Sequence, residues 1–209
     1  MRQIPFIALA FASLTSLQAQ THNHVGLVFN ILVPMGEFRE KTYLPSLDLP
    51  VSQVEGYDVG LGGQLTMSFP LQKNVAFRVG IGGTSTNGTN TASGYDTINL
   101  RHTMFSLSGE WQFFLRDAYE HRGTFLAVGI SGDFERFSRT FEDWWGYELD
   151  VTRKNRLGGI ISIGHSFYSR PVFNFTFELS YHATLTNKDL SRREPPASDL
   201  LKINFGFVF

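Results

Sequence analysis

The segment KINFGFVF, residues 202–209, is the part of the sequence that decides the fold. Its side chains alternate with a period of two, as they do along a β-strand, where successive side chains point to opposite faces. One face is apolar and mostly aromatic, and the other is small or polar apart from one valine: Ile203, Phe205, Phe207 and Phe209 against Lys202, Asn204, Gly206 and Val208. Chain ends usually fray into water, so three phenylalanines on one face of this strand indicate an apolar surrounding.

A strand with apolar residues at every second position and a C-terminal phenylalanine resembles the assembly signal of bacterial outer-membrane β-barrels. The resemblance rests on Ile203, Phe205, Phe207 and Phe209. It implies a Gram-negative bacterium, a location in the bacterial cell outer membrane, and insertion by the barrel-assembly machinery.

The composition narrows the function classes. A formal net charge of −1 gives no indication of nucleic-acid binding. Cysteine is absent, which excludes a disulfide framework, a cysteine nucleophile and a cysteine-linked lipid anchor. The 20 phenylalanines and 20 glycines suggest strands with bulky side chains on one face and a crowded opposite face. We expect no cofactor and no nucleic-acid partner.

The first residues are typical of a secretory signal peptide. Arg2 precedes an apolar run from Ile4 to Leu17, and Gln18 and Ala19 follow. This run is too short for a comfortable membrane span, so we expect cleavage after Ala19 and a barrel domain over 20–209. An uncleaved anchor is the alternative. The rest of the chain has no long apolar run, so a membrane-spanning form would have to be a closed barrel.

Seven further alternating segments precede the final strand, at 25–33, 57–69, 75–82, 105–113, 126–133, 161–167 and 173–182. Eight strands of this kind predict an all-β fold, an eight-stranded antiparallel transmembrane β-barrel with up-and-down order, and resemble the OmpA/OmpX-like family. A soluble eight-stranded barrel is the alternative, but it would carry its large apolar face inside. Here the second face is mostly Gly, Ser, Thr and Ala, as a narrow filled lumen requires.

The lengths of the connections predict the orientation. Those after the second, fourth and sixth strands are shorter, and those after the first, third, fifth and seventh are long and polar: 70–74, 114–123 and 168–171 against 36–56, 83–97, 138–152 and 186–199. Short turns on the periplasmic side and long loops outside are usual for such barrels. Both chain ends are then expected in the periplasm.

Four charged residues fall on the lumen face. Arg78 and Glu110 are expected at similar heights on neighbouring strands, and so are Glu178 and Lys202. Ions in a narrow lumen are tolerated when they are paired, because an unpaired buried charge is costly. We therefore predict two interior salt bridges that plug the lumen. A plain core-filling role and a gating role remain open.

The histidines are the residues that could support a catalytic function. His182 faces the lumen near Glu178 and Ser180, and a His-Ser-Glu set would suggest a lipid A deacylase type of hydrolase. His165 adjoins Ser166, but adjacent residues of a strand point to opposite faces. No catalytic residue is predicted.

Two polar connections carry candidate surface contacts. The third long loop contains the aromatic residues Trp144, Trp145 and Tyr147, which suggest a binding loop, although aromatics also line the membrane interface of barrels. The fourth contains Arg192 and Arg193, whose guanidinium groups suit the phosphates of lipopolysaccharide.

The sequence therefore predicts a non-enzymatic integral outer-membrane β-barrel, with a side-chain-plugged lumen and extracellular binding loops. We expect a monomer in contact with outer-membrane lipid and lipopolysaccharide. A narrow passive diffusion pore is the first alternative, and a lipid A acyl hydrolase is the second. His22 and His24 are too few to make a metal site, so none is expected.

Overall fold

The computed structural model describes residues 23–36, 57–90, 97–143, 146–170, 173–186 and 198–209. They form eight strands: β1 (His24–Pro34), β2 (Gly60–Gln72), β3 (Val75–Asn90), β4 (Thr97–Phe114), β5 (Gly123–Asp143), β6 (Gly146–Arg170), β7 (Phe173–Thr184) and β8 (Leu200–Val208). Each strand pairs with its neighbours in chain order, and β8 closes the sheet against β1. The signal-peptide prediction falls on residues outside the described ranges.

Closure depends on the pairing of β1 with β8. These strands run antiparallel, with Phe29 opposite Phe205 and Asn30 opposite Asn204. A closed sheet has no edge, so every strand can pair its backbone groups within the sheet. The predicted fold, an eight-stranded antiparallel up-and-down barrel, is confirmed.

The outer surface carries the large apolar side chains. They cover all eight strands, and examples are Leu27, Leu61, Ile81, Phe105, Trp111, Leu126, Ile130, Ile161, Phe177 and Phe207. The lumen holds most of the buried charged and polar groups instead. This distribution is that of a barrel embedded in a membrane, and it excludes the soluble-barrel alternative. None of the described residues forms a helix long and apolar enough to cross a membrane.

Two apolar clusters lie inside the barrel, one toward each end. The cluster at the loop end consists of Leu32, Tyr57, Leu100, Met104, Phe137 and Leu200. The cluster at the end with the short turns consists of Ala76, Phe114, Ala118, Phe125 and Ala127. Tyr57 was the first residue of the predicted segment 57–69, but it precedes β2 and is only 6% exposed, so it belongs to the interior.

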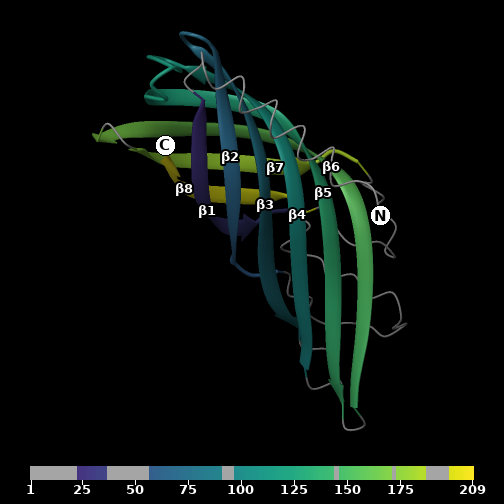
Figure 1. The fold of residues 1–209 in the computed structure, drawn as a ribbon. Coiled ribbons are helices and arrows are strands. Elements are labelled where there is room, and N and C mark those ends of the chain that lie inside the picture. The colour runs from purple at the N-terminus through teal and green to yellow at the C-terminus, as the bar shows by residue number, and fades with distance from the viewer. Residues whose placement is uncertain (1–22, 37–56, 91–96, 144–145, 171–172, 187–197) are drawn as a thin grey trace, which may run out of the picture.

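The strands extend far beyond the membrane-facing band at the loop end. The predicted connections 83–97 and 138–152 are largely strand, because β3 continues to Asn90 and β5 and β6 almost meet at Asp143 and Gly146. Figure 1 shows β4, β5 and β6 continuing past the shorter strands as a curved, tapering sheet. An apolar alternation marks only the part of a strand that faces lipid, so the water-exposed continuation was missed.

Candidate functional site

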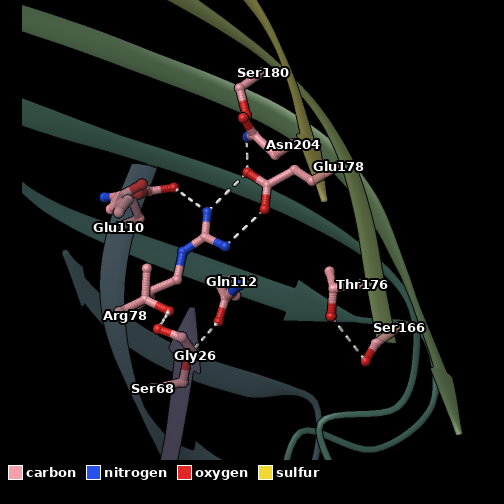
Figure 2. A network of polar contacts seen from close by, with 12 residues as sticks. Gly26, Ser68, Arg78, Glu110, Gln112, Ser166, Thr176, Glu178, Ser180 and Asn204 are labelled. Atoms are coloured by element: carbon pink, nitrogen blue, oxygen red, sulfur yellow. Dashed lines mark hydrogen bonds and ion pairs between the residues drawn. The ribbon is translucent and has the colours of Figure 1, made fainter. Parts of the chain in front are cut away.

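The centre of the lumen is organised by Arg78 of β3. Its Nη1 donates to Glu178 Oε2 at 2.7 Å, and its Nη2 donates to Glu178 Oε1 at 2.8 Å and to Glu110 Oε2 at 2.6 Å. Figure 2 shows the guanidinium between the two carboxylates. The three side chains are 8%, 4% and 3% exposed, so this pairing is almost wholly shielded from water. Two-pronged contact of this kind is the strong form of an arginine–carboxylate pair.

Glu178 has a different partner from the one expected. The sequence analysis matched Glu178 with Lys202, but Lys202 lies opposite Ser180 and Asn204 lies opposite Glu178. Glu178 reaches across the lumen to Arg78 instead. Among the described residues, no acidic side chain forms a direct ion pair with Lys202, although it lines the same small cavity as Glu110 and Glu178. Adjacency of strands was a poor guide because the narrow lumen brings opposite walls into contact.

Polar side chains extend the central cluster. Ser180 Oγ donates to Glu178 Oε1 at 2.9 Å, Asn204 Nδ2 donates to Ser180 Oγ at 2.8 Å, and Asn30 Nδ2 donates to Asn204 Oδ1 at 2.7 Å. On the Glu110 side, a chain of bonds runs from Gln64 through Ser108. Each carboxylate therefore has a neutral donor as well as the guanidinium.

A second buried cluster joins β5 and β7. His182 Nε2 lies 2.9 Å from Ser131 Oγ and 3.0 Å from Asp133 Oδ2, and Ser131 Oγ donates to the same Oδ2 at 3.1 Å. A hydrolytic triad needs the serine and the acid on opposite ring nitrogens of the histidine. Here both contact Nε2, so the histidine cannot take a proton from the serine while the acid orients its other nitrogen. The serine and acid around His182 differ from the expected Ser180 and Glu178.

A third cluster of buried polar and charged side chains lies against the apolar cluster at the loop end. Arg156 Nη1 lies 3.2 Å from Glu135 Oε2, and Glu135 Oε1 lies 3.5 Å from His102 Nε2. Arg156 Nη1 also donates to Ser198 Oγ at 3.3 Å. The sequence analysis missed this cluster because these residues fall between or beyond the segments with clear apolar alternation.

The turn between β4 and β5 packs into the end of the barrel that carries the short turns. His121, which has a left-handed φ of 46°, is 2% exposed and packs edge-on against Phe114 with ring centroids 5.0 Å apart. Its backbone oxygen accepts a bond from Asn174 Nδ2 at 3.1 Å. Burial, with smaller contributions from His24 and Arg78, lowers the pKa of His121 from 6.5 to about 3. His121 is therefore a neutral part of the plug at neutral pH.

The polar filling leaves little free space in the lumen. The cavity around Arg78, Glu110, Glu178 and Lys202 has a volume of about 30 Å³. Such a cavity holds roughly one or two water molecules. Neither a solute path nor a substrate pocket follows from this geometry. Among the described residues, no group of three His, Asp or Glu side chains could hold a metal ion.

Several predicted surface residues are not part of this site. Trp144, Trp145, Arg192, Arg193 and His22 lie outside the described residues, and Tyr147 belongs to strand β6 rather than to a loop. His165 and Ser166 do face opposite sides of β6. His165 Nδ1 lies 2.9 Å from Thr124 Oγ1, and Ser166 is buried beside His121.

Three residues of the predicted assembly signal, Ile203, Phe205 and Phe207, lie on β8 at the barrel seam, and Phe209 directly follows this strand. Phe205 stacks edge-on with Phe177 of β7, with ring centroids 5.4 Å apart. Phe209 and Val25 exchange two backbone hydrogen bonds, of 2.8 and 3.1 Å. The end of the chain is therefore tied to the first strand.

Among solved structures, three small barrels resemble the chain. Neisserial surface protein A matches at 12% identity over 90% of this chain and 96% of that one, with a TM-score of 0.48. Ail of Yersinia pestis, solved with the heparin analogue sucrose octasulfate, gives the same four figures. The N-terminal β-barrel domain of Pseudomonas aeruginosa OprF matches at 13% identity over 89% and 97%, with a TM-score of 0.39.

The likeness concerns the barrel alone. No protein-family model matches the chain, and no curated protein does. At such low identities nothing about ligands or partners carries over from the three structures. What this barrel does has to be inferred from its own residues.

Proposed function

We propose that the protein is a non-enzymatic integral barrel of the bacterial outer membrane, exported with a signal peptide that is cleaved after Ala19. Its lumen is closed by its own side chains, and its contacts with lipid and other molecules are made by outer surfaces at the loop end. The observation that carries this proposal is the three-layered lumen filling, in which a buried ion cluster around Arg78 lies between two apolar closures.

Each layer opposes conduction in its own way. The apolar closures contain Leu100, Phe137 and Leu200 at one end and Phe114 and Phe125 at the other, and these buried side chains occupy space that a hydrated solute would need. The central guanidinium is already bound by two carboxylates through both of its terminal nitrogens, so it offers no low-cost stopping place for an ion. The diffusion-pore alternative is therefore disfavoured.

Catalysis has less support than the structural role. The one Ser-His-Asp grouping among the described residues is buried and bonds through a single ring nitrogen, and its three members are each at most 2% exposed. An acyl chain of lipid A has no route to Ser131 through the apolar closures. The surface of the barrel, rather than its lumen, is where we place function.

The test is single-channel recording of the refolded protein in a planar bilayer. We expect a silent membrane after insertion has been verified by the change in gel migration on boiling. An Arg78→Ala, Lys202→Ala double variant, recorded in parallel, shows whether removing the two lumen cations opens a path. Steady openings of the unsubstituted protein would overturn the plugged-barrel proposal, and a change of ion selectivity in the variant would then place these cations in the pore.

A further inference from the structure

A groove of about 620 Å³ lies on the outer surface of strands β2 to β6. It exists because one outward position carries no side chain: a Cβ built at Gly83 would meet only the backbone oxygen of Met104, at 3.8 Å. Its lining includes the apolar and basic side chains of Leu61, Phe105, Phe134, Arg136 and Arg153. Polar residues and Glu135 also belong to the lining, and the Glu135 carboxylate is buried against Arg156.

The groove has an apolar floor and a basic rim in successive rows of the sheet. In the floor row, Gly83 lies opposite Phe105 and Phe105 opposite Phe134, whose rings are 6.1 Å apart between centroids. In the next row toward the loop end, Arg136 lies opposite Arg153. The surface therefore changes from aromatic to cationic within one step of the two-residue repeat.

The rim carries positive charge that the described part of the protein does not neutralise. Arg136 and Arg153 are exposed and directly opposed on neighbouring strands, and Arg101 lies one row further toward the loop end. None of the three forms an ion pair with an acidic side chain among the described residues. Like charges facing each other across a sheet are unfavourable. An anion bound between the two arginines would replace this repulsion with attraction.

The position of the rim indicates which anion. Along β5 the outward side chains are apolar from Leu126 through Phe134, and Arg136 is the first charged one. The arginines thus stand at the upper edge of the lipid-facing band, where the head groups of the outer leaflet lie. Phosphate suits paired guanidinium groups, which bind it with two parallel hydrogen bonds.

We propose that this groove binds a phosphorylated lipid of the outer leaflet, with a head-group phosphate held by Arg136 and Arg153 and an acyl chain lying over Phe105 and Phe134. The inference deepens the proposed function and rests on it, because it needs the loop end to face the outer leaflet. It assigns the lipid contact to the barrel wall rather than to the predicted loop residues Arg192 and Arg193.

The experiment measures lipid carried by the folded protein. The refolded barrel is mixed in detergent with diphosphoryl lipid A or with the same acylated disaccharide lacking both phosphates, and bound lipid is counted by native mass spectrometry. We expect binding of the phosphorylated form and at least about tenfold weaker binding by an Arg136→Gln, Arg153→Gln variant, since each basic side chain near a lipid head group contributes measurably. Equal binding of the dephosphorylated lipid would overturn the proposal.

A control variant separates the site from general charge. Arg116 and Arg122 are exposed on the β4–β5 turn at the opposite end, so Arg116→Gln, Arg122→Gln removes the same charge elsewhere. We expect this control to bind lipid as the unsubstituted protein does. Loss of binding in both double variants, or in neither, would contradict the assignment.

A second variant keeps every charge. Gly83→Leu fills the groove from its open side, and it should weaken lipid A binding severalfold while leaving the gel shift of the folded barrel unchanged. Unchanged lipid A binding by this variant would show that the acyl chain does not lie in the proposed groove. A barrel that is silent in bilayers yet binds no lipid A would refute this inference and leave the plugged-barrel proposal standing.

Discussion

Arg78 is the residue on which the lumen's charge balance depends. It is 7% exposed and stands between the carboxylates of Glu110 and Glu178. Moving a charged group from water into the protein interior costs roughly several kcal/mol per ion. The ion pairs offset this cost only while each charge keeps its partner. Removing the shared cation therefore differs from removing an ordinary surface arginine, because it leaves two buried anions facing each other.

An Arg78→Met variant should consequently lose stability. We expect a loss of about 3–5 kcal/mol in urea unfolding of the refolded protein, which is the usual cost of leaving buried charge unpaired. Adding Glu110→Gln and Glu178→Gln to the same chain should recover most of it, since the anions disappear with their partner. Arg153→Met, at an exposed position, serves as the control and should change stability by less than about 0.5 kcal/mol. An unchanged midpoint for Arg78→Met would show that the pair contributes nothing.

His121 makes the plug sensitive to acid. Its pKa in the folded protein is about 3, against an ordinary 6.5, so the unfolded chain binds the proton more readily. Stability from this residue is thus present above pH 6.5 and is lost as the pH falls from 6.5 toward 3. The neighbouring His24 and Arg78 oppose protonation of His121, and Glu178, which favours it, is held by Arg78.

A His121→Asn variant should therefore have a flatter dependence of stability on pH. Asparagine tolerates the left-handed backbone at this turn and does not titrate. Between pH 6 and 4, we expect the unsubstituted protein to lose up to about 1.4 kcal/mol more per pH unit than the variant. Urea unfolding at several pH values measures this difference, and His165→Gln, on the outer surface, should keep the original slope. Parallel curves for the unsubstituted protein and His121→Asn would exclude His121 as the source.

At the scale of the strands, the sequence predicted the segments that face lipid and missed the parts of the strands that extend beyond the membrane. The outward faces could be predicted because each strand must present apolar side chains at every second position inside the membrane. Beyond Phe105 and Phe134 that requirement ends, so the continuations of β3, β5 and β6 were taken for loops.

The candidate site was predictable only in part, for a related reason. The lumen-facing ions follow from alternation, and Arg78 and Glu110 lie directly opposite in the register of β3 and β4. The contact of Arg78 with Glu178 joins residues 100 positions apart across the lumen, and it depends on strand tilt and stagger. The apolar clusters escaped notice because Phe125 is a single large residue on a face otherwise composed of small ones, and because Leu100 precedes the predicted segment 105–113.

At the scale of the whole molecule, the barrel is completed where its last strand meets its first. The β1–β8 seam is formed by segments from the two ends of the chain, so it joins residues of very large sequence separation. Such a contact is slow to form, because the intervening chain must first be ordered. A factor that recognises β8 while the seam is open would accelerate assembly, and this is the role that the resemblance assigns to Phe209 and the apolar residues before it.

Replacing Phe209 should therefore impair assembly in cells more than folding in the test tube. We expect Phe209→Ala to lower severalfold the amount of heat-modifiable barrel in the outer membrane, because the recognition signal is weakened. The purified variant should refold in detergent with a gel shift like that of the unsubstituted protein, since the backbone hydrogen bonds to Val25 do not require the ring. Phe113→Ala, at an outward aromatic of β4 that is exposed to 47% and lies away from the seam, is the matched control and should assemble normally. Equal loss in cells and in vitro would make Phe209 a structural residue of the seam rather than a signal.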